Sequence, residues 1–289
     1  MSTDYLARLN RAIDYVTANL AEPIRLEDVA QAAGLSSFHF HRIFSGLMGE
    51  TLGAFITRTR LERALYLMSH RKGTTLTEIA LACGFSSSSD FSRVFRGRYG
   101  VSPRKFDLEA WRSARRETML KNLPAVSNPD NFTVSVRPLP ARRVAYIRVH
   151  KPYGGGGVVA AIEQLTAWAE ARGLADGQWL GYQWDDPEIV ELAKCRYDVG
   201  LEIPNATEVN GEVSVTTFPS GLVAEIDIMG PIELELRALH WLFAWLPTSG
   251  YAPAHQPMFE AWNGRPFAHG STHFELRVQL PVVDASVPL

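Results

Sequence analysis

Apolar residues in the first part of the chain recur at the spacing of an amphipathic helix. The spacing is first seen at Leu6, Leu9, Ile13, Val16 and Leu20. It predicts a helix from about Asp4 to Asn19, ended by Pro23. Leu52 to Ser69 reads as one continuous helix, about 18 residues and so about 27 Å long. Thr51 is the N-cap signal before that helix, and Ser102-Pro103 is an equivalent signal that predicts a further helix start.

Two segments flanking the long helix are copies of one another. Their first halves match at an offset of 50 residues, as for Gly34 and Gly84, and their second halves at 51, as for Arg42 and Arg93. In each copy a short helix leads to the glycine, which supplies a tight turn, and serines then cap a second helix. This order of elements is the helix-turn-helix pattern, which the sequence therefore contains twice.

Each second helix has one apolar face. That face is formed by Phe40, Ile43 and Phe44 in the first copy and by Phe91, Val94 and Phe95 in the second. The side chains expected away from it are Phe38, His39, His41 and Arg42 in the first copy and Ser88, Ser89, Arg93 and Arg96 in the second. Simple exposure is the alternative interpretation for the two histidines.

Alternation of apolar and polar residues dominates the second half of the chain. Val134 to Ile147 returns as Val213 to Ile226 at an unbroken offset of 79. The expected strands are 134–136, 144–149, 179–184 and 197–203, then 213–215, 223–228, 258–262 and 274–280, and the expected helices are 160–172 and 232–246. A duplicated strand-strand-helix-strand-strand unit predicts an α+β domain with two helices on one shared antiparallel sheet.

Charge separates the two halves. Residues 1–121 hold 18 Lys and Arg against 12 Asp and Glu, whereas residues 122–289 hold 11 against 19. A basic half joined to an acidic half favours polyanion binding by the first, although two ordinary solvated surfaces would give the same balance. We predict an all-α double helix-turn-helix domain over 1–112, a Pro-, Ser- and Asn-containing linker over 113–130, and the α+β domain over 131–289.

The first domain resembles the AraC-type DNA-binding domain over roughly residues 5–107. The motifs that carry the resemblance are Arg60-Leu61-x-x-Ala64, Ile79-Ala80-x-x-Cys83-Gly84-Phe85, Phe91-Ser92-Arg93-Val94-Phe95 and Gly100-Val101-Ser102-Pro103. The resemblance implies that Phe38, His41 and Arg42 face the major groove from the first recognition helix, and Ser88, Ser89 and Arg93 from the second, with Arg96 beside them. Either Arg42 or Arg93 could read guanine or contact phosphate. Asp90 is unusual beside DNA and could cap its helix or orient Arg93.

The second domain resembles the GyrI-like effector-binding domain over about residues 130–283. The resemblance rests on the duplication, on Gly230-Pro231 after a strand, on Trp245-Leu246 followed by Ser249-Gly250-Tyr251, and on Glu260-x-Trp262. In that family a ligand sits between the repeats, and the acid of the Glu-x-aromatic motif projects into the cleft. Glu260 has this place here, and Trp262 stands where the family usually has Tyr.

Comparison of the two units adds further pocket candidates. It places Tyr182 opposite Glu260, Trp184 opposite Trp262 and Tyr146 opposite Glu225. A carboxylate with aromatic neighbours suits a cationic or aromatic ligand. For most of the aromatic residues ordinary core packing is the competing interpretation, and Glu225 could face solvent.

Together the two resemblances imply a cytoplasmic transcriptional regulator, expected to be an activator. The N-terminus lacks a signal pattern, and no apolar run approaches membrane-spanning length. The expected partners of this regulator are double-stranded promoter DNA, RNA polymerase and a small-molecule effector. We expect no membrane association, no cofactor, no metal and no catalytic residue. Two alternatives stay open for the second domain: a hydrolase of electrophilic small molecules that uses Glu260, or a ligand-free protein-interaction module.

Overall fold

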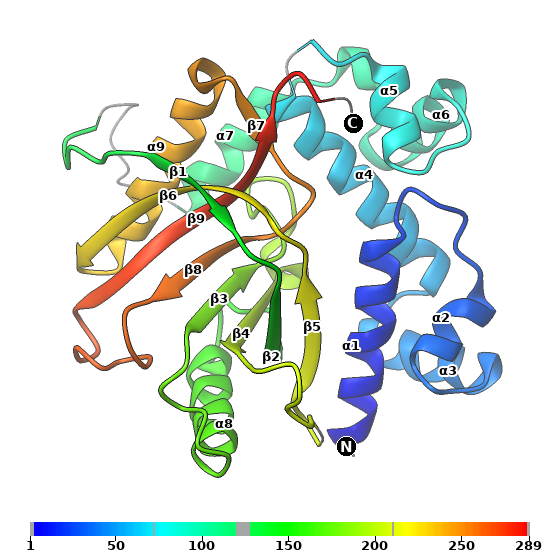
Figure 1. Cartoon of the computed structure of the whole chain (residues 1–289). Helices are drawn as coiled ribbons and strands as arrows, with labels where there is room; N and C mark the ends of the chain where they lie inside the picture. Colours follow the sequence, from blue (N-terminus) through cyan, green and yellow to red (C-terminus); the bar gives the residue numbers. More distant parts are fainter. Residues whose placement is uncertain (1–2, 72, 120–127, 210, 288–289) are drawn as a thin grey trace. The chain divides into compact units, whose positions relative to one another are not determined.

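The computed structural model describes residues 3–71, 73–119, 128–209 and 211–287. These residues form two compact units that divide between Ser113 and Ala114 (Figure 1). We call them the helical unit and the sheet unit and describe each by itself. The elements of the first are α1 (Thr3–Ala18), α2 (Leu26–Ala32), α3 (Ser37–Met48), α4 (Leu52–His70), α5 (Leu76–Ala82), α6 (Ser88–Tyr99), the 3-10 turn η1 (Pro103–Lys105) and α7 (Leu108–Met119), which crosses the division.

Hydroxyl side chains set the starts of four of these helices. Ser36, Thr51, Thr75 and Ser87 each accept a hydrogen bond from the backbone N–H three residues further on. Such caps satisfy donors that the first helical turn leaves unpaired. Because capping is a local interaction, the predicted helix starts lie within a residue or two of the observed ones.

The repeated unit is three helices long, one helix longer than the predicted motif. α1 packs against α2 and α2 against α3, and in the same way α4 packs against α5 and α5 against α6. At an offset of 52, Arg8 corresponds to Arg60 and Ala12 to Ala64, and both alanines are completely buried. α4 is therefore both the connection between the copies and the first helix of the second copy.

The helix start predicted at Ser102-Pro103 is realised only as the single turn η1, without a side-chain cap from Ser102. The chain then becomes extended at Phe106, whose ring contacts those of Phe95 and Trp111 at centroid distances of 5.3 and 5.4 Å. The next helix, α7, begins only at Leu108. Residues 113–119 of the predicted linker are helical as part of α7, and 120–127 lie outside the described residues. The predicted domain boundaries stay predictions.

The sheet unit contains one antiparallel sheet over the described residues. Its strands are β1 (Ser135–Leu139), β2 (Arg142–His150), β3 (Trp179–Gln183), β4 (Arg196–Glu202), β5 (Ser214–Phe218), β6 (Gly221–Gly230), β7 (Tyr251–Pro253), β8 (Met258–Trp262) and β9 (Phe274–Asp284). Their order is β1-β6-β9-β8-β3-β4-β2-β5, with β7 beside β9. The first strand of each repeat is exchanged, because β1 pairs with β6 of the second repeat and β5 with β2 of the first.

Both helices of the sheet unit cover the same face of the sheet. α8 (Gly157–Glu170) packs against β2 and β4, and α9 (Glu233–Ser249) packs against β6, β7 and β9. Alternate strand residues contribute to the two cores under these helices, whereas the intervening ones form a third cluster on the opposite face. This confirms the predicted shared sheet with two helices. The strands β3 and β8 lie side by side in its middle, where the two repeats meet (Figure 1).

Candidate DNA interface and small-molecule site

The first recognition helix, α3, buries its apolar face and exposes the predicted contact residues. Phe40 and Phe44 are 1% and 0% exposed. Phe38, in contrast, is 81% exposed although it is a large apolar side chain. His41 and Arg42 are also exposed. The face of α3 that carries the three predicted contact residues is therefore open to solvent.

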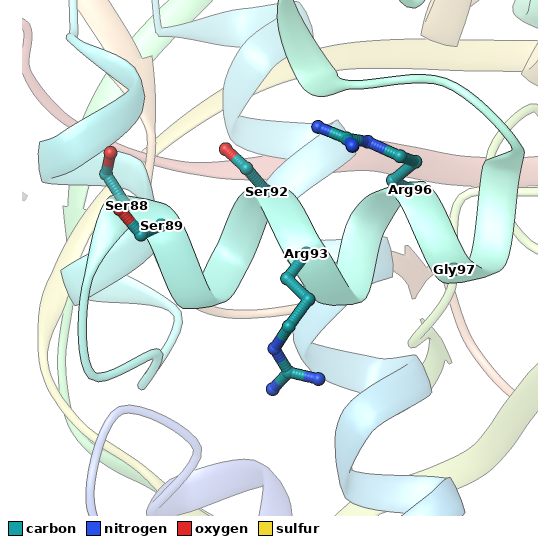
Figure 2. A pocket seen from close by; sticks show the side chains of 6 residues that line it. All are labelled: Ser88, Ser89, Ser92, Arg93, Arg96 and Gly97. Atoms are coloured by element: carbon teal, nitrogen blue, oxygen red, sulfur yellow. The ribbon is translucent and has the colours of Figure 1, made fainter.

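The second recognition helix, α6, presents a polar and basic face. A surface hollow of about 680 Å³ follows it, lined by Ser88, Ser89, Ser92, Arg93, Arg96 and Gly97. Figure 2 shows that Arg93 and Arg96 extend from α6 in different directions. Four of the six lining residues were predicted contacts. Ser92 and Gly97 were missed, although each lies one helical turn from a predicted contact on the same face.

Of the two roles that the sequence left open for Asp90, the structure shows the orientation of Arg93, whereas Ser87 is the residue that caps the helix. The backbone N–H of Asp90 is bonded to the cap Ser87, and its carboxylate accepts hydrogen bonds from Ser86 Oγ at 3.1 Å and from Arg93 Nη2 at 2.7 Å. The bond from Arg93, followed by smaller contributions from Ser86, holds the pKa of Asp90 below its ordinary value. Asp90 is therefore ionised at neutral pH and fixes the position of Arg93.

Charged groups on α4 stiffen the connection between the two recognition helices. Arg58 bonds both Glu50 and Glu62, at 2.6 and 2.9 Å. Arg60 donates to the backbone carbonyls of Leu20 and Glu22 at 3.0 and 2.7 Å. The helix has 19 residues and is thus about 28 Å long. The spacing of the two helix-turn-helix copies is therefore set by a continuous, internally bonded helix.

In the sheet unit, Glu260 lies on the middle strand β8 and is 4% exposed. Tyr197 Oη donates to its Oε2 at 3.0 Å and Trp262 Nε1 at 3.2 Å, while Gln183 Nε2 donates to Oε1 at 3.2 Å. Gly181 lies directly opposite Glu260 in the strand register. A Cβ at Gly181 would stand 1.9 Å from the Tyr197 hydroxyl oxygen, so the absence of a side chain there lets the phenol reach Glu260.

A second carboxyl group joins this site from helix α9. Glu235 is 7% exposed, and its Oε1 accepts from the same Gln183 amide at 2.7 Å. Burial, and then the adjacent Glu260 carboxylate, hold the pKa of Glu235 well above its ordinary value. Burial also raises the pKa of Glu260, although its hydrogen bonds offset part of that rise. The two groups titrate as a pair, and a proton on Glu235 bonded to ionised Glu260 is the arrangement that these causes favour.

No Lys, Arg or His among the described residues forms an ion pair with this carboxyl pair. Its partners are amide, phenol and indole groups, which donate hydrogen bonds but carry no positive charge. Burying a carboxylate without a counter-charge costs roughly several kcal/mol of free energy. The site is therefore electrostatically suited to a cation.

The other four predicted pocket residues lie on the opposite face of the sheet. The register pairs Glu260 with Gly181 and Tyr182 with Phe259, so the prediction that Tyr182 lies opposite Glu260 was wrong. Since successive strand residues point to opposite faces, Tyr182 belongs to the cluster away from the helices, whereas Trp262 packs under them. Tyr182 stacks on Phe218 with ring centroids 4.4 Å apart.

Trp184, Tyr146 and Glu225 are also engaged on that opposite face. Trp184 Nε1 donates to Asp198 at 2.6 Å, and Arg148 lies over the rings of both Trp184 and Tyr146. Glu225 is buried instead of facing solvent and accepts hydrogen bonds from Arg137 and Gln279. Burial opposes its ionisation, but these bonds more than offset that effect and lower its pKa. Of the six predicted pocket residues, the structure thus brings together only Glu260 and Trp262.

Three members of the Glu260 site were missed from the sequence: Glu235, Gln183 and Tyr197. For Glu235 a signal was present, because it falls on the apolar stripe of α9 formed by Ala238, Leu239, Leu242 and Leu246. An acidic residue on a buried stripe needs a specific reason. Gln183 and Tyr197 carried no local signal, since their contacts depend on how β3, β4 and β8 pair.

Within the described part of the chain, no group of three or more His, Cys, Asp or Glu side chains is arranged to hold a metal ion. The same part contains no helix that is both long and apolar enough to cross a membrane.

Comparison with known proteins divides the chain in the same way. Residues 29–108 match the model of a helix-turn-helix domain, and residues 132–283 match that of a GyrI-like small molecule binding domain. The regulatory protein PocR of Salmonella typhimurium is 34% identical over 104 residues, which are 36% of this chain and 34% of PocR. The probable transcription factor PqrA of Proteus vulgaris is 35% identical over 85 residues, covering 29% of this chain and 69% of PqrA.

Solved structures of comparable identity also cover about a third of this chain. A transcriptional regulator from Chromobacterium violaceum, described as AraC-type, has a TM-score of 0.32 and 32% identity, covering 34% of this chain and 87% of that chain. The matches to the first three curated relatives span 34% to 41% of their lengths.

Proposed function

Because the chain belongs to the AraC family of transcriptional regulators and carries a GyrI-like small-molecule-binding domain, we propose that it is a sequence-specific activator controlled by a small molecule. In this proposal the helical unit reads promoter DNA, and the sheet unit binds a cationic or aromatic effector at Glu260. RNA polymerase is the proposed partner for activation.

The proposed DNA contacts come from the exposed faces of both recognition helices. They are Phe38, His41 and Arg42 of α3 and Ser88, Ser89, Arg93 and Arg96 of α6. Phe38 suits a thymine methyl group, and an arginine can bind guanine through two hydrogen bonds. The length of α4, about 28 Å, is compatible with two contacts near one DNA turn, about 34 Å apart, on the same side of a duplex. Two recognition helices in one chain remove the need for a dimer to occupy two sites.

The observation that carries the effector proposal is the carboxyl pair without a cationic partner. A positively charged ligand would supply the missing counter-charge to Glu260, while Trp262 and Tyr197 would offer ring surfaces beside it. The ligand would control transcription only if it bound two conformations of the protein with different affinities. A ligand that binds Glu260 through charge should favour the ionised form of the pair, so its affinity should rise with pH.

The test measures binding of monocationic aromatic dyes and of neutral analogues to the full chain by calorimetry. Replacing Glu260 by Gln keeps the volume and removes the charge, and we expect cation affinity to fall roughly 30-fold or more. Glu225→Gln is the matched control, since Glu225 is equally buried but lies on the opposite face with Arg137 as its partner. Equal losses in both variants, or a wild-type protein that binds no cation of the panel, would contradict the proposal.

The paired carboxyl groups also favour a second candidate function. A protonated acid next to an ionised one can act as general acid and base, so the site has the groups needed to hydrolyse an electrophilic compound. Incubation of the pure protein with each bound compound, followed by mass spectrometry, distinguishes sensing from turnover. Unchanged compound supports a sensor, and a hydrolysed product that disappears in Glu260→Gln supports an enzyme. If neither binding nor turnover occurs, a ligand-free interaction module is the remaining alternative.

A further inference from the structure

The two recognition helices differ at one place that bears on how each reads DNA. At the offset of 51, Arg93 of α6 corresponds to Arg42 of α3, and Asp90 corresponds to His39. Arg93 is bonded to Asp90 at 2.7 Å. His39 instead approaches Tyr5 of α1, at 3.5 Å, and Arg42 has no acceptor among the described residues. The two equivalent arginines therefore differ, because a carboxylate holds Arg93 and no carboxylate in the described part of the chain holds Arg42.

The Asp90 carboxylate is itself held by hydrogen bonds at the start of α6. One oxygen of Asp90 accepts from Arg93, and the other accepts from Ser86 Oγ at 3.1 Å, while Ser87 holds the Asp90 backbone N–H. The Asp90 side chain is 30% exposed, whereas Arg93 is 76% exposed. A partly buried carboxylate thus accepts a hydrogen bond from the terminal Nη2 of Arg93, whose side chain extends from α6 and lines the hollow along it (Figure 2).

The chemistry of the pair favours recognition of guanine. The bond to Asp90 uses one of the five N–H donors of the guanidinium group, which leaves a free edge for the O6 and N7 acceptors of guanine. A guanidinium held in place loses less side-chain entropy when it binds a base. The carboxylate also disfavours an alternative contact of Arg93 with phosphate, because it repels the DNA backbone.

On the basis of the proposed function, we infer that Asp90 is a positioning residue that makes α6 select guanine through Arg93, and that α3 lacks this selectivity at Arg42. Asp90 therefore acts through Arg93 and raises specificity at the expense of overall affinity. This assigns unequal roles to two helices that arose by duplication.

The test selects sequences from a randomised duplex library with the full-length protein at constant salt, and then measures affinity for single-base variants of the selected site. Arg93→Ala identifies the guanine that depends on α6, with an expected loss of preference of about 10-fold or more. Asp90→Asn should reduce preference at that same position by roughly 2- to 5-fold, the range that an exposed ion pair contributes. Its affinity for unrelated duplexes should increase, because one negative charge is removed.

Glu78→Gln is the matched control for charge and capping. Glu78 is an exposed acid that completes the capping box of α5 in the same helix-turn-helix copy, and it does not contact Arg93. This variant should raise affinity for unrelated duplexes without changing preference at the guanine position. If Asp90→Asn and Glu78→Gln behave alike, Asp90 only caps its helix and the inference is overturned.

A gain-of-function variant keeps the inference testable if Asp90→Asn destabilises α6. His39→Asp introduces a carboxylate into α3, three residues before Arg42. This variant should create or sharpen a guanine preference in the other half of the selected site. Failure of both Asp90→Asn and His39→Asp to change any position refutes the inference while leaving DNA binding intact. A wild-type protein that selects no sequence at all refutes sequence-specific binding and the inference together.

Discussion

Replacement of Gly84 by Ala is expected to destabilise the helical unit by about 3–5 kcal/mol. Gly84 forms the turn before the second recognition helix and has a φ of +78°. A methyl group in this left-handed conformation costs about 1–2 kcal/mol by itself. The remainder follows from what surrounds the position.

A Cβ at Gly84 would lie 2.4 Å from the carbonyl oxygen of Leu20 and 2.7 Å from Arg60 Nη2. The carbonyl belongs to the backbone and cannot rotate away. Arg60 is held by its two bonds to the carbonyls of Leu20 and Glu22. Each hydrogen bond from a charged donor contributes about 1.5–3 kcal/mol, so a shift of this side chain that breaks one of its two bonds adds roughly 2–3 kcal/mol to the backbone strain.

Gly100→Ala is the matched control. Gly100 ends α6 with a φ of +79°, but nothing lies within 4 Å of the Cβ that it would acquire. This variant should lose only the conformational contribution, about 1–2 kcal/mol. Gly34→Ala should fall between the two, since its Cβ would meet only the flexible end of Arg8, at 3.1 Å.

Urea unfolding followed by the helical circular dichroism signal measures the differences. Because the chain has two compact units, the free energy of unfolding is taken from the transition of the helical unit alone. The reasoning fails if Gly84→Ala and Gly100→Ala cost the same, because crowding by Leu20 and Arg60 would then contribute nothing. In the absence of urea, Gly84→Ala should also weaken DNA binding, because the turn at Gly84 positions α6.

Two further predictions concern the sheet unit. The pKa of Glu235 is raised above its ordinary value of 4.5 by burial and by Glu260, so the unfolded chain loses this proton first. The contribution of Glu235 to stability is therefore greatest below about pH 4.5 and declines as pH rises. Glu235→Gln should make that decline shallower and stabilise the sheet unit at neutral pH, which urea midpoints over a pH series would show. Identical slopes of stability against pH in the variant and the wild type would contradict the assignment of the proton to Glu235. Asp198→Asn should cost about 3–5 kcal/mol, because Asp198 accepts two bonds of 2.7 Å from the completely buried guanidinium of Arg148. An unfolding free energy within about 1 kcal/mol of the wild-type value would show that this pair is not a buried ion pair in solution.

The helices were predictable because their signals are local. Caps such as Ser36 and Ser87 and the spacing of Phe40, Phe44, Phe91 and Phe95 act within one or two turns, so the sequence is sufficient to place α3 and α6. The prediction at Ser102-Pro103 failed in extent, because the chain leaves the helical conformation at Phe106. Both α1 and α4 were predicted as helices, but their membership of the repeat was missed, because the matching residues Arg8 and Arg60 bond to backbone carbonyls far away in the sequence.

The pocket residues show the limit of strand patterns. Alternation identifies which residues of one strand share a face, but it does not say which strands pair or in which register. The comparison that placed Tyr182 opposite Glu260 differs by one residue from the observed pairing of Gly181 with Glu260. In a sheet, a shift of one residue moves a side chain to the other face. This shift explains why Tyr182 and Trp184 lie on the face opposite to Glu260.

The sequence by itself determined the two duplications and the faces of the recognition helices, since periodicity, capping and short motifs are local properties. Only the tertiary structure decided that Glu235, Gln183 and Tyr197 surround Glu260, because α9, β3, β4 and β8 meet through pairing between distant segments. The bond from Arg93 to Asp90 lies between these cases. Its spacing is visible in the sequence, but the rotamers that form it are set by the three-dimensional environment at the start of α6.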